Sequence, residues 1–183
     1  MPFFSRSDMK KTLSILLLLT LSAVLAALYA VYVEPAHVVV EHQTIAVPGW
    51  HSRQDLVMAQ LSDLHIGSVS DAFLQEVVDR LDEQKPDIIL LTGDLLTSQK
   101  LYEQAGTPTF AREFARLQAW LKKLHAPLGL FAVRGNHDFS DDKELSDLFV
   151  NLLREQGITV LTNQRTIIPV DGDSLFLDRK SVV

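Results

Sequence analysis

The sequence contains no cysteine, which excludes disulfide bonds and thiolate metal sites. Any metal ion must therefore be bound by histidine, carboxylate or amide groups, and such ligands favour Mn, Fe, Zn or Mg. An excess of basic residues is also lacking, because 17 Lys and Arg stand against 23 Asp and Glu and give a net charge of −6. This balance argues against a nucleic-acid-binding surface. Apolar residues make up 47% of the chain and charged residues 22%, a composition typical of a folded protein.

A long apolar run near the N-terminus is the first positive feature. Residues 12–33 (TLSILLLLTLSAVLAALYAVYV) carry no charge, and as a helix they would extend about 33 Å, enough to cross a bilayer. Arg6, Lys10 and Lys11 precede the run, which favours a cytoplasmic segment 1–11 and places the rest of the chain on the periplasmic side of the inner membrane. A cleaved signal peptide is the alternative, but the run exceeds a usual signal core and no clean A-x-A site ends it. We expect a single retained anchor.

The remaining chain alternates short apolar segments with amphipathic ones. Strands are expected over residues 37–47, 55–61, 87–91, 129–133, 158–161, 166–170 and 174–177. Helices are expected after a cap at Ser70 or Asp71, from Thr107, and between Asp141 and Gly157, with their acidic faces in solvent. Strands and helices in alternation predict an α/β fold with a mainly parallel sheet built from βαβ units.

Polar residues follow three successive strands of this predicted sheet. In such folds the carboxyl ends of parallel strands line the ligand crevice, and right-handed crossovers bring those ends to one edge. We therefore expect the three polar groups to converge, although they lie far apart in the sequence. In chain order they are Asp63 and His65, then Asp94, then Asn136, His137 and Asp138.

These groups offer ligands suited to divalent cations. Asp63 and His65 stand two residues apart, so on an extended segment they point to one side and a single ion can bind both. Asp94 follows a glycine, and its two oxygens can bridge two ions. Asn136 adds a neutral amide oxygen. A lone Asp, Asn or Gly-Asp is more often a turn residue, but all three groups at successive strand ends indicate a two-metal centre.

The chemistry expected of such a centre is hydrolysis of a phosphate ester. Two ions about 3.5 to 4 Å apart would lower the pKa of a bridging water, and the resulting metal-bound hydroxide would attack phosphorus in line. His137 stands beside Asn136, where it can contact the phosphate or protonate the leaving oxygen. Asp138 can orient the imidazole of His137 and raise its pKa.

The motifs D-x-H, G-D and G-N-H-D resemble the first three signatures of the calcineurin-like metallophosphoesterases. The stretches 60–67 (QLSDLHIG) and 90–95 (LLTGDL) are most similar to the membrane-anchored bacterial branch of that family. The resemblance covers about residues 40–177 and implies half of the family's four-layer sandwich. Family members hydrolyse phosphomonoesters, phosphodiesters or pyrophosphates, and part of the membrane branch is associated with lipid-linked substrates such as UDP-diacylglucosamine.

The resemblance also implies a role for each residue of the site. Asp63 and His65 would hold the first metal ion, Asp94 would bridge the two ions, and Asn136 would hold the second. His137 would act on the phosphate. One departure from the family pattern is small: the second Asp of its G-D-x-x-D motif, a supportive position, is replaced by Thr97.

A second departure is larger. The family completes both metal sites with later G-H and G-H-x-H motifs, whereas no histidine follows His137 in this sequence. We therefore expect an incomplete phosphoesterase domain over residues 34–177, truncated at its C-terminal end, with residues 178–183 as a tail that is foreign to it. For the chain as it stands we expect weak metal binding and little or no turnover.

Together these features predict a single-pass membrane protein whose outer domain is a two-metal phosphoesterase. Its partners would be the membrane and a phosphate-ester substrate, with lipid-linked esters among the candidates. The alternative is a non-catalytic relative that keeps the fold and binds a partner or a lipid. The intact series of ligand types from Asp63 to His137 favours the enzyme.

Overall fold

The computed structural model describes residues 6–34, 37–51, 55–97, 105–138 and 143–178. It consists of two compact units, Met1–Val39 and Val40–Val183. In the first unit, helix α1 (Arg6–Tyr32) contains the stretch Met9–Tyr32, which is long and apolar enough to cross a membrane, with a mean hydropathy of 2.4. An N-terminal signal sequence has the same properties, so the retained anchor stays a prediction.

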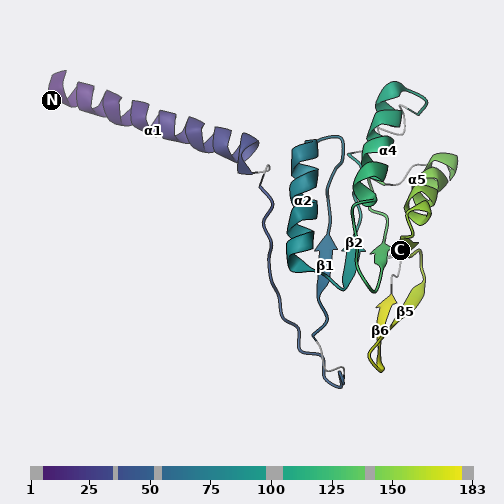
Figure 1. The fold of residues 1–183 in the computed structure, drawn as a ribbon. Helices are drawn as coiled ribbons and strands as arrows, with labels where there is room; N and C mark the ends of the chain where they lie inside the picture. The colour runs from purple at the N-terminus through teal and green to yellow at the C-terminus, as the bar shows by residue number, and fades with distance from the viewer. Residues whose placement is uncertain (1–5, 35–36, 52–54, 98–104, 139–142, 179–183) are drawn as a thin grey trace. The chain divides into compact units, whose positions relative to one another are not determined.

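The second unit is built on a four-stranded parallel sheet (Figure 1). Its strands lie side by side in chain order: β1 (Met58–Leu61), β2 (Ile88–Leu91), β3 (Leu130–Ala132) and β4 (Thr159–Val160). The register pairs Leu61 with Leu91 and Leu91 with Ala132, so β1, β2 and β3 end at the same level. The expected α/β fold with a mainly parallel sheet is confirmed.

Among the described residues, three helices connect successive strands of this sheet: α2 (Asp71–Gln84), α4 (Pro108–Leu121) and α5 (Lys143–Glu155). Ser70 is the cap of α2, because its hydroxyl accepts a hydrogen bond from the N–H of Phe73, and Thr107 caps α4 in the same way. Helix α4 contacts both α2 and α5. Since the strand order is sequential, crossovers of the usual right hand place all three helices on one face of the sheet.

An antiparallel hairpin of β5 (Arg165–Val170) and β6 (Asp173–Asp178) forms a second, two-stranded sheet. The hairpin packs against the parallel sheet through a buried cluster of Ile88, Phe131, Ile168 and Val170. Because side chains alternate along a strand, Ile88 points toward the hairpin and the fully buried Ile89 points to the opposite face. Strand β2 is therefore buried on both faces, as its continuously apolar sequence requires.

The sequence prediction differs from the structure in several elements. Residues 37–47 form no strand: they are almost all exposed, and none of them pairs in either described sheet. β-Branched residues favour a strand only where a neighbouring strand can pack against them. The strand expected over 55–61 begins at Met58. Asp141, expected to start the last helix, and residues 179–183 lie outside the described residues, whereas Asp178 is the final residue of β6.

Candidate metal centre

The segment that follows β1 runs alongside the segment that follows β2. The N–H of Asp63 donates to the carbonyl of Gly93 at 3.1 Å, and the N–H of His65 donates to the carbonyl of Asp94 at 3.0 Å. These bonds continue the parallel pairing beyond the ends of both strands. They bring the D-x-H motif and the G-D motif together, as the strand order predicts.

Three of the candidate site residues adopt a left-handed backbone. The φ angles are +55° at Asp63, +46° at His65 and +53° at Asp94. Residues with a Cβ atom seldom adopt this region, although Asp and His are enriched there among the non-glycine residues. Such strain persists only where the surrounding structure holds it, and it occurs frequently at functional sites. The bonds between the two loops supply part of that support.

Two glycines allow the loop after β2 to touch the loop after β3. A Cβ atom on Gly93 would lie 2.5 Å from the backbone nitrogen of Gly135, which is too close for any side chain. A Cβ atom on Gly135 would collide with the carboxylate of Asp94. The glycine that precedes each motif is therefore required by close packing, and both loops can meet only because neither glycine has a side chain.

His65, Asp94 and His137 form a compact group at this point. One ligand atom from each residue, a ring nitrogen or a carboxylate oxygen, lies within 4.8 Å of the other two. The imidazole rings meet edge to face, with their centroids 5.0 Å apart and an interplanar angle of 76°. The backbone N–H of His137 donates to Oδ1 of Asp94 at 2.8 Å, which fixes the orientation of that carboxylate. The strand ends thus converge as expected.

The hydrogen bond of His65 indicates which of its nitrogens can bind a metal ion. Nδ1 lies 3.2 Å from the carbonyl oxygen of Leu96, an acceptor, so we assign the ring proton to Nδ1. Nε2 is then left as the ligand atom, a tautomer that backbone carbonyls commonly fix in metal-binding histidines. Nε2 also lies 3.9 Å from Oδ1 of Asp63. The side chain of Asp63 is 64% exposed, so it stands at the open rim of the group.

The structure places the remaining predicted residues in two different settings. Asn136 is exposed in the turn after β3, next to His137. Asp138 is completely buried, and its carboxylate accepts hydrogen bonds from the N–H of Leu96 at 3.0 Å and the N–H of Gly135 at 3.1 Å. Burial raises the pKa of Asp138 above its ordinary value, against these backbone hydrogen bonds, which lower it. The carboxylate joins the loops after β2 and β3, and its role in orienting His137 stays a prediction.

The donor set of this group suits a borderline divalent cation. Two imidazole nitrogens and a carboxylate oxygen are ligands that Mn, Fe and Zn accept, and a carboxylate and an amide stand close by in the motifs. Comparison with known proteins agrees with this chemistry, because the sequence profile of the Calcineurin-like phosphoesterase family matches residues 56–180. This chain belongs to the calcineurin-like phosphoesterase family. The resemblance inferred from the three motifs is confirmed.

Several curated proteins are similar to this chain in sequence. The chain is 42% identical over 86 residues to UDP-2,3-diacylglucosamine pyrophosphatase LpxG of Chlamydia trachomatis, covering 46% of this chain and 23% of LpxG. It is 31% identical over 157 residues to the uncharacterized metallophosphoesterase YkuE of Bacillus subtilis, covering 80% of this chain and 49% of YkuE. It is 34% identical over 114 residues to the phosphodiesterase YaeI of Escherichia coli, covering 59% of this chain and 37% of YaeI. The chain thus spans half or less of the length of these relatives.

Several residues that support the phosphoesterase site were not predicted. Thr97 was noted only as a departure from the G-D-x-x-D motif, yet its hydroxyl donates to the carbonyl groups of His65 and Ile66, at 3.2 and 2.7 Å. Glu113, expected in solvent with the other helix acids, is only 4% exposed. A signal for it was present, because Glu113 lies three residues after Phe110 and four before Leu117, within the apolar stripe of its helix.

Proposed function

We propose that this protein is a metal-dependent phosphoesterase that binds two divalent cations at the carboxyl ends of β1, β2 and β3. The observation that carries the proposal is the convergence of His65, Asp94 and His137 from three separate strands, with their ligand atoms within 4.8 Å of one another. Membership of the phosphoesterase family gives the reaction type. Residues brought together only by folding, under backbone strain, are unusual outside a functional site.

In this proposal Asp63 and His65 would hold the first ion, Asn136 would hold the second, and Asp94 would contribute to both sites. The cations would supply Lewis-acid chemistry and, by lowering the pKa of water, a nucleophile near neutral pH. The hydrogen bond from the N–H of His137 keeps the carboxylate of Asp94 aimed at the centre. The same hydrogen bond positions the backbone of His137, whose imidazole is half-buried beside that of His65.

His137 is the proposed proton donor. From the G-N-H-D turn, beside Asn136, the imidazole would lie next to a phosphate bound at the second ion. There it would hydrogen-bond the phosphate and protonate the leaving oxygen, a task that histidine performs more often than any other side chain. Asp138 holds the turn through the N–H of Gly135 and, in this proposal, also orients the imidazole.

The proposed substrate is a lipid-linked phosphate ester or pyrophosphate. The relative LpxG is named for the pyrophosphatase reaction on UDP-2,3-diacylglucosamine, and YaeI is named a phosphodiesterase. Helix α1 adds an apolar stretch that can span a membrane. As a retained anchor over residues 12–33 it would hold the domain beside a lipid surface, on the periplasmic side of the inner membrane, because basic residues precede it.

The test is hydrolysis of p-nitrophenyl phosphate and bis(p-nitrophenyl) phosphate with Mn²⁺, Fe²⁺, Zn²⁺ or Mg²⁺, by the product of the complete reading frame. Asp94→Asn keeps the shape of the side chain and removes its charge, so we expect a loss of about 10²-fold or more in turnover. Asp79→Asn, the same change on the exposed face of α2, is the matched control and should leave turnover unchanged. Zero turnover by the wild type with every metal would contradict the proposal and favour a non-catalytic binding protein.

A further inference from the structure

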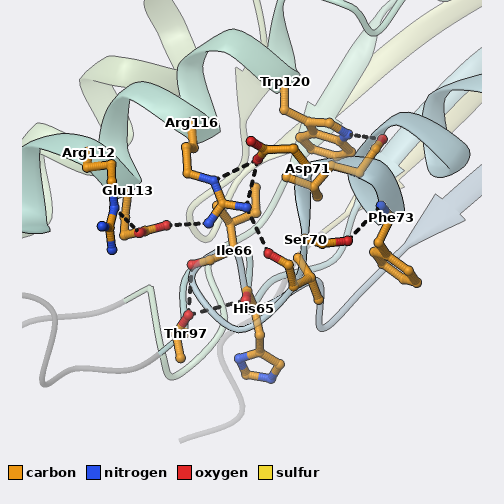
Figure 2. A network of polar contacts seen from close by, with 12 residues as sticks. His65, Ile66, Ser70, Asp71, Phe73, Thr97, Arg112, Glu113, Arg116 and Trp120 are labelled. Atoms are coloured by element: carbon orange, nitrogen blue, oxygen red, sulfur yellow. Dashed lines mark hydrogen bonds and ion pairs between the residues drawn. The ribbon is translucent and has the colours of Figure 1, made fainter. Parts of the chain in front are cut away.

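A network of charged side chains on α4 contacts the segment that carries His65 (Figure 2). At its centre is Glu113, whose side chain is 5% exposed and pairs with two arginines of its own helix, Arg112 and Arg116. Arg112 is 67% exposed, whereas Arg116 is 21% exposed. A buried carboxylate is costly unless it is paired and hydrogen-bonded, so its retention inside the domain calls for an explanation.

The guanidinium of Arg116 reaches three acceptors at once. Its Nη1 donates to Oε2 of Glu113 at 2.7 Å, its Nε donates to Oδ1 of Asp71 at 2.9 Å, and its Nη2 donates to the carbonyl of Val69 at 2.7 Å. Partial burial works to lower the pKa of Arg116, but the hydrogen bonds and charges of Glu113 and Asp71 raise it above its ordinary value. The planar fork of an arginine can hold three acceptors in fixed directions, which a lysine cannot.

Those acceptors define one end of the segment 65–71. Val69 directly precedes Ser70, the cap of α2, and Asp71 is the first residue of that helix. The other end is held by Thr97, through the carbonyl groups of His65 and Ile66. The segment is therefore fastened at both ends by side chains that come from other parts of the fold.

Between these two ends lies Gly67, with a φ angle of +122°. A Cβ atom at Gly67 would collide with the hydroxyl of Thr97 and would lie 3.7 Å from Oε2 of Glu113. The carboxylate of Glu113 therefore lies on the side of Gly67 where a side chain would point, and it also pairs with the guanidinium of Arg116. Arg116 in turn contacts the end of the segment.

The strand that leads into this segment lies at the edge of the sheet. Within the part of the chain that the structure describes, β1 pairs only with β2, and no strand supports the segment on its other side. His65 nevertheless holds a left-handed φ of +46°, which needs support. Figure 2 shows its imidazole pointing away from Arg116, so any effect of the arginine on that ring must pass through the backbone.

We infer that Arg116, with Glu113 as its buried counterion, is a positioning residue that holds the segment 65–71 so that His65 faces Asp94 and His137. The inference rests on the proposed function, since the value of this geometry lies in metal binding. Groups that orient metal ligands without touching the ion commonly change metal affinity by about 10- to 100-fold when removed. We expect a change of that size for Arg116→Gln.

The experiment compares wild type, Arg116→Gln, Arg116→Lys and the control Arg112→Gln. Each protein is the product of the complete reading frame, as in the test of the proposed function, and is studied in detergent micelles. Arg112→Gln removes the other arginine that pairs with Glu113 but leaves the segment 65–71 untouched. It is the same substitution as Arg116→Gln, in the same helix and at a partner of the same carboxylate. Mn²⁺ affinity is measured by titration calorimetry on protein shown to be folded by circular dichroism. We expect about 10- to 100-fold weaker Mn²⁺ binding for Arg116→Gln, a smaller loss for Arg116→Lys and no change for Arg112→Gln.

Two further readouts separate positioning from general stability. The first is hydrogen exchange of the His65 amide in metal-free protein, measured by NMR: Arg116→Gln should lose protection there and retain it in the core strands. The second is rescue: saturating Mn²⁺ should restore the kcat of Arg116→Gln, because all the ligands are still present. Unchanged Mn²⁺ affinity, or equal loss of protection throughout the domain, would overturn the inference. Failure of the wild type to bind Mn²⁺ would overturn the proposed function instead, and the amide exchange would still decide the role of Arg116.

Discussion

Replacing Asp138 with alanine should destabilise the phosphoesterase domain strongly. The carboxylate is completely buried and accepts hydrogen bonds from the N–H groups of Leu96 and Gly135, which belong to the loops after β2 and β3. A hydrogen bond to a charged group contributes about 1.5 to 3 kcal/mol, and each buried donor left without a partner costs about 1 to 3 kcal/mol. Burial of the carboxylate is itself unfavourable, so the net contribution of its two hydrogen bonds lies in the lower part of this range. We therefore expect Asp138→Ala to lower the free energy of unfolding by about 3 to 4 kcal/mol.

That loss is large beside the free energy of unfolding of a typical domain, about 5 to 15 kcal/mol. Asp138→Asn keeps the shape of the side chain and one carbonyl oxygen, but turns an NH₂ group toward the other donor, so we expect about half the effect, near 2 kcal/mol. The measurement is urea denaturation followed by tryptophan fluorescence, for which the buried Trp120 is the reporter.

The matched control is Asp79→Asn on the exposed face of α2, which should change the free energy of unfolding by less than about 0.5 kcal/mol. An Asp138→Ala protein within about 1 kcal/mol of wild type would refute the reasoning, since the buried N–H of Leu96 and the partly buried N–H of Gly135 would then lose their acceptor at almost no cost. An Asp138→Asn protein as unstable as Asp138→Ala would show that charge, not shape, gives the whole contribution.

Three shorter predictions concern the metal centre and its support. Gly135→Ala should weaken Mn²⁺ binding in calorimetry, because the added methyl group displaces the Asp94 carboxylate; unchanged affinity would show that the loop relaxes freely. Trp120→Phe should lower the free energy of unfolding by about 1 to 2 kcal/mol in urea denaturation followed by circular dichroism, since the carbonyl of Leu74 loses the indole N–H; a larger loss would point to repacking between α2 and α4. The 183-residue chain should bind Mn²⁺ only weakly in calorimetry, because no histidine follows His137; two tightly bound ions would contradict this expectation.

The sheet and the convergence of the site could be predicted because each depends on a local pattern. Continuous apolar runs gave the buried strands, and residues that follow parallel strands must share an edge of the sheet. Ser70 could not be chosen over Asp71 as the cap of α2, because both side chains can accept the same bond. The structure selects Ser70 through the N–H of Phe73, which leaves Asp71 to pair with Arg116.

The supporting residues of the site could not be predicted in the same way. Asp138 was expected to act on its neighbour in the sequence, but the contacts of its carboxylate include an N–H that lies 42 positions away, and only the fold determines such a partner. The prediction of a strand over residues 37–47 was wrong for a related reason. A segment forms a strand only where a neighbouring strand is available to pair with it, and the sequence of the segment does not show this. Glu113 was assigned to solvent from its charge, although its place in the apolar stripe of α4 indicated burial.

The contact between Gly93 and Gly135 has a consequence for how sequences of this domain can vary. A Cβ atom at Gly93 would collide with the backbone of Gly135, and a Cβ atom at Gly135 would collide with Asp94, the residue after Gly93. A methyl group added at either position therefore forces the same two loops apart. Once the first substitution has separated the loops, a second has little left to disrupt, and the two effects should fall well short of their sum in a double-mutant cycle. In mutational terms the two positions behave as a single site, although they stand at the ends of different strands.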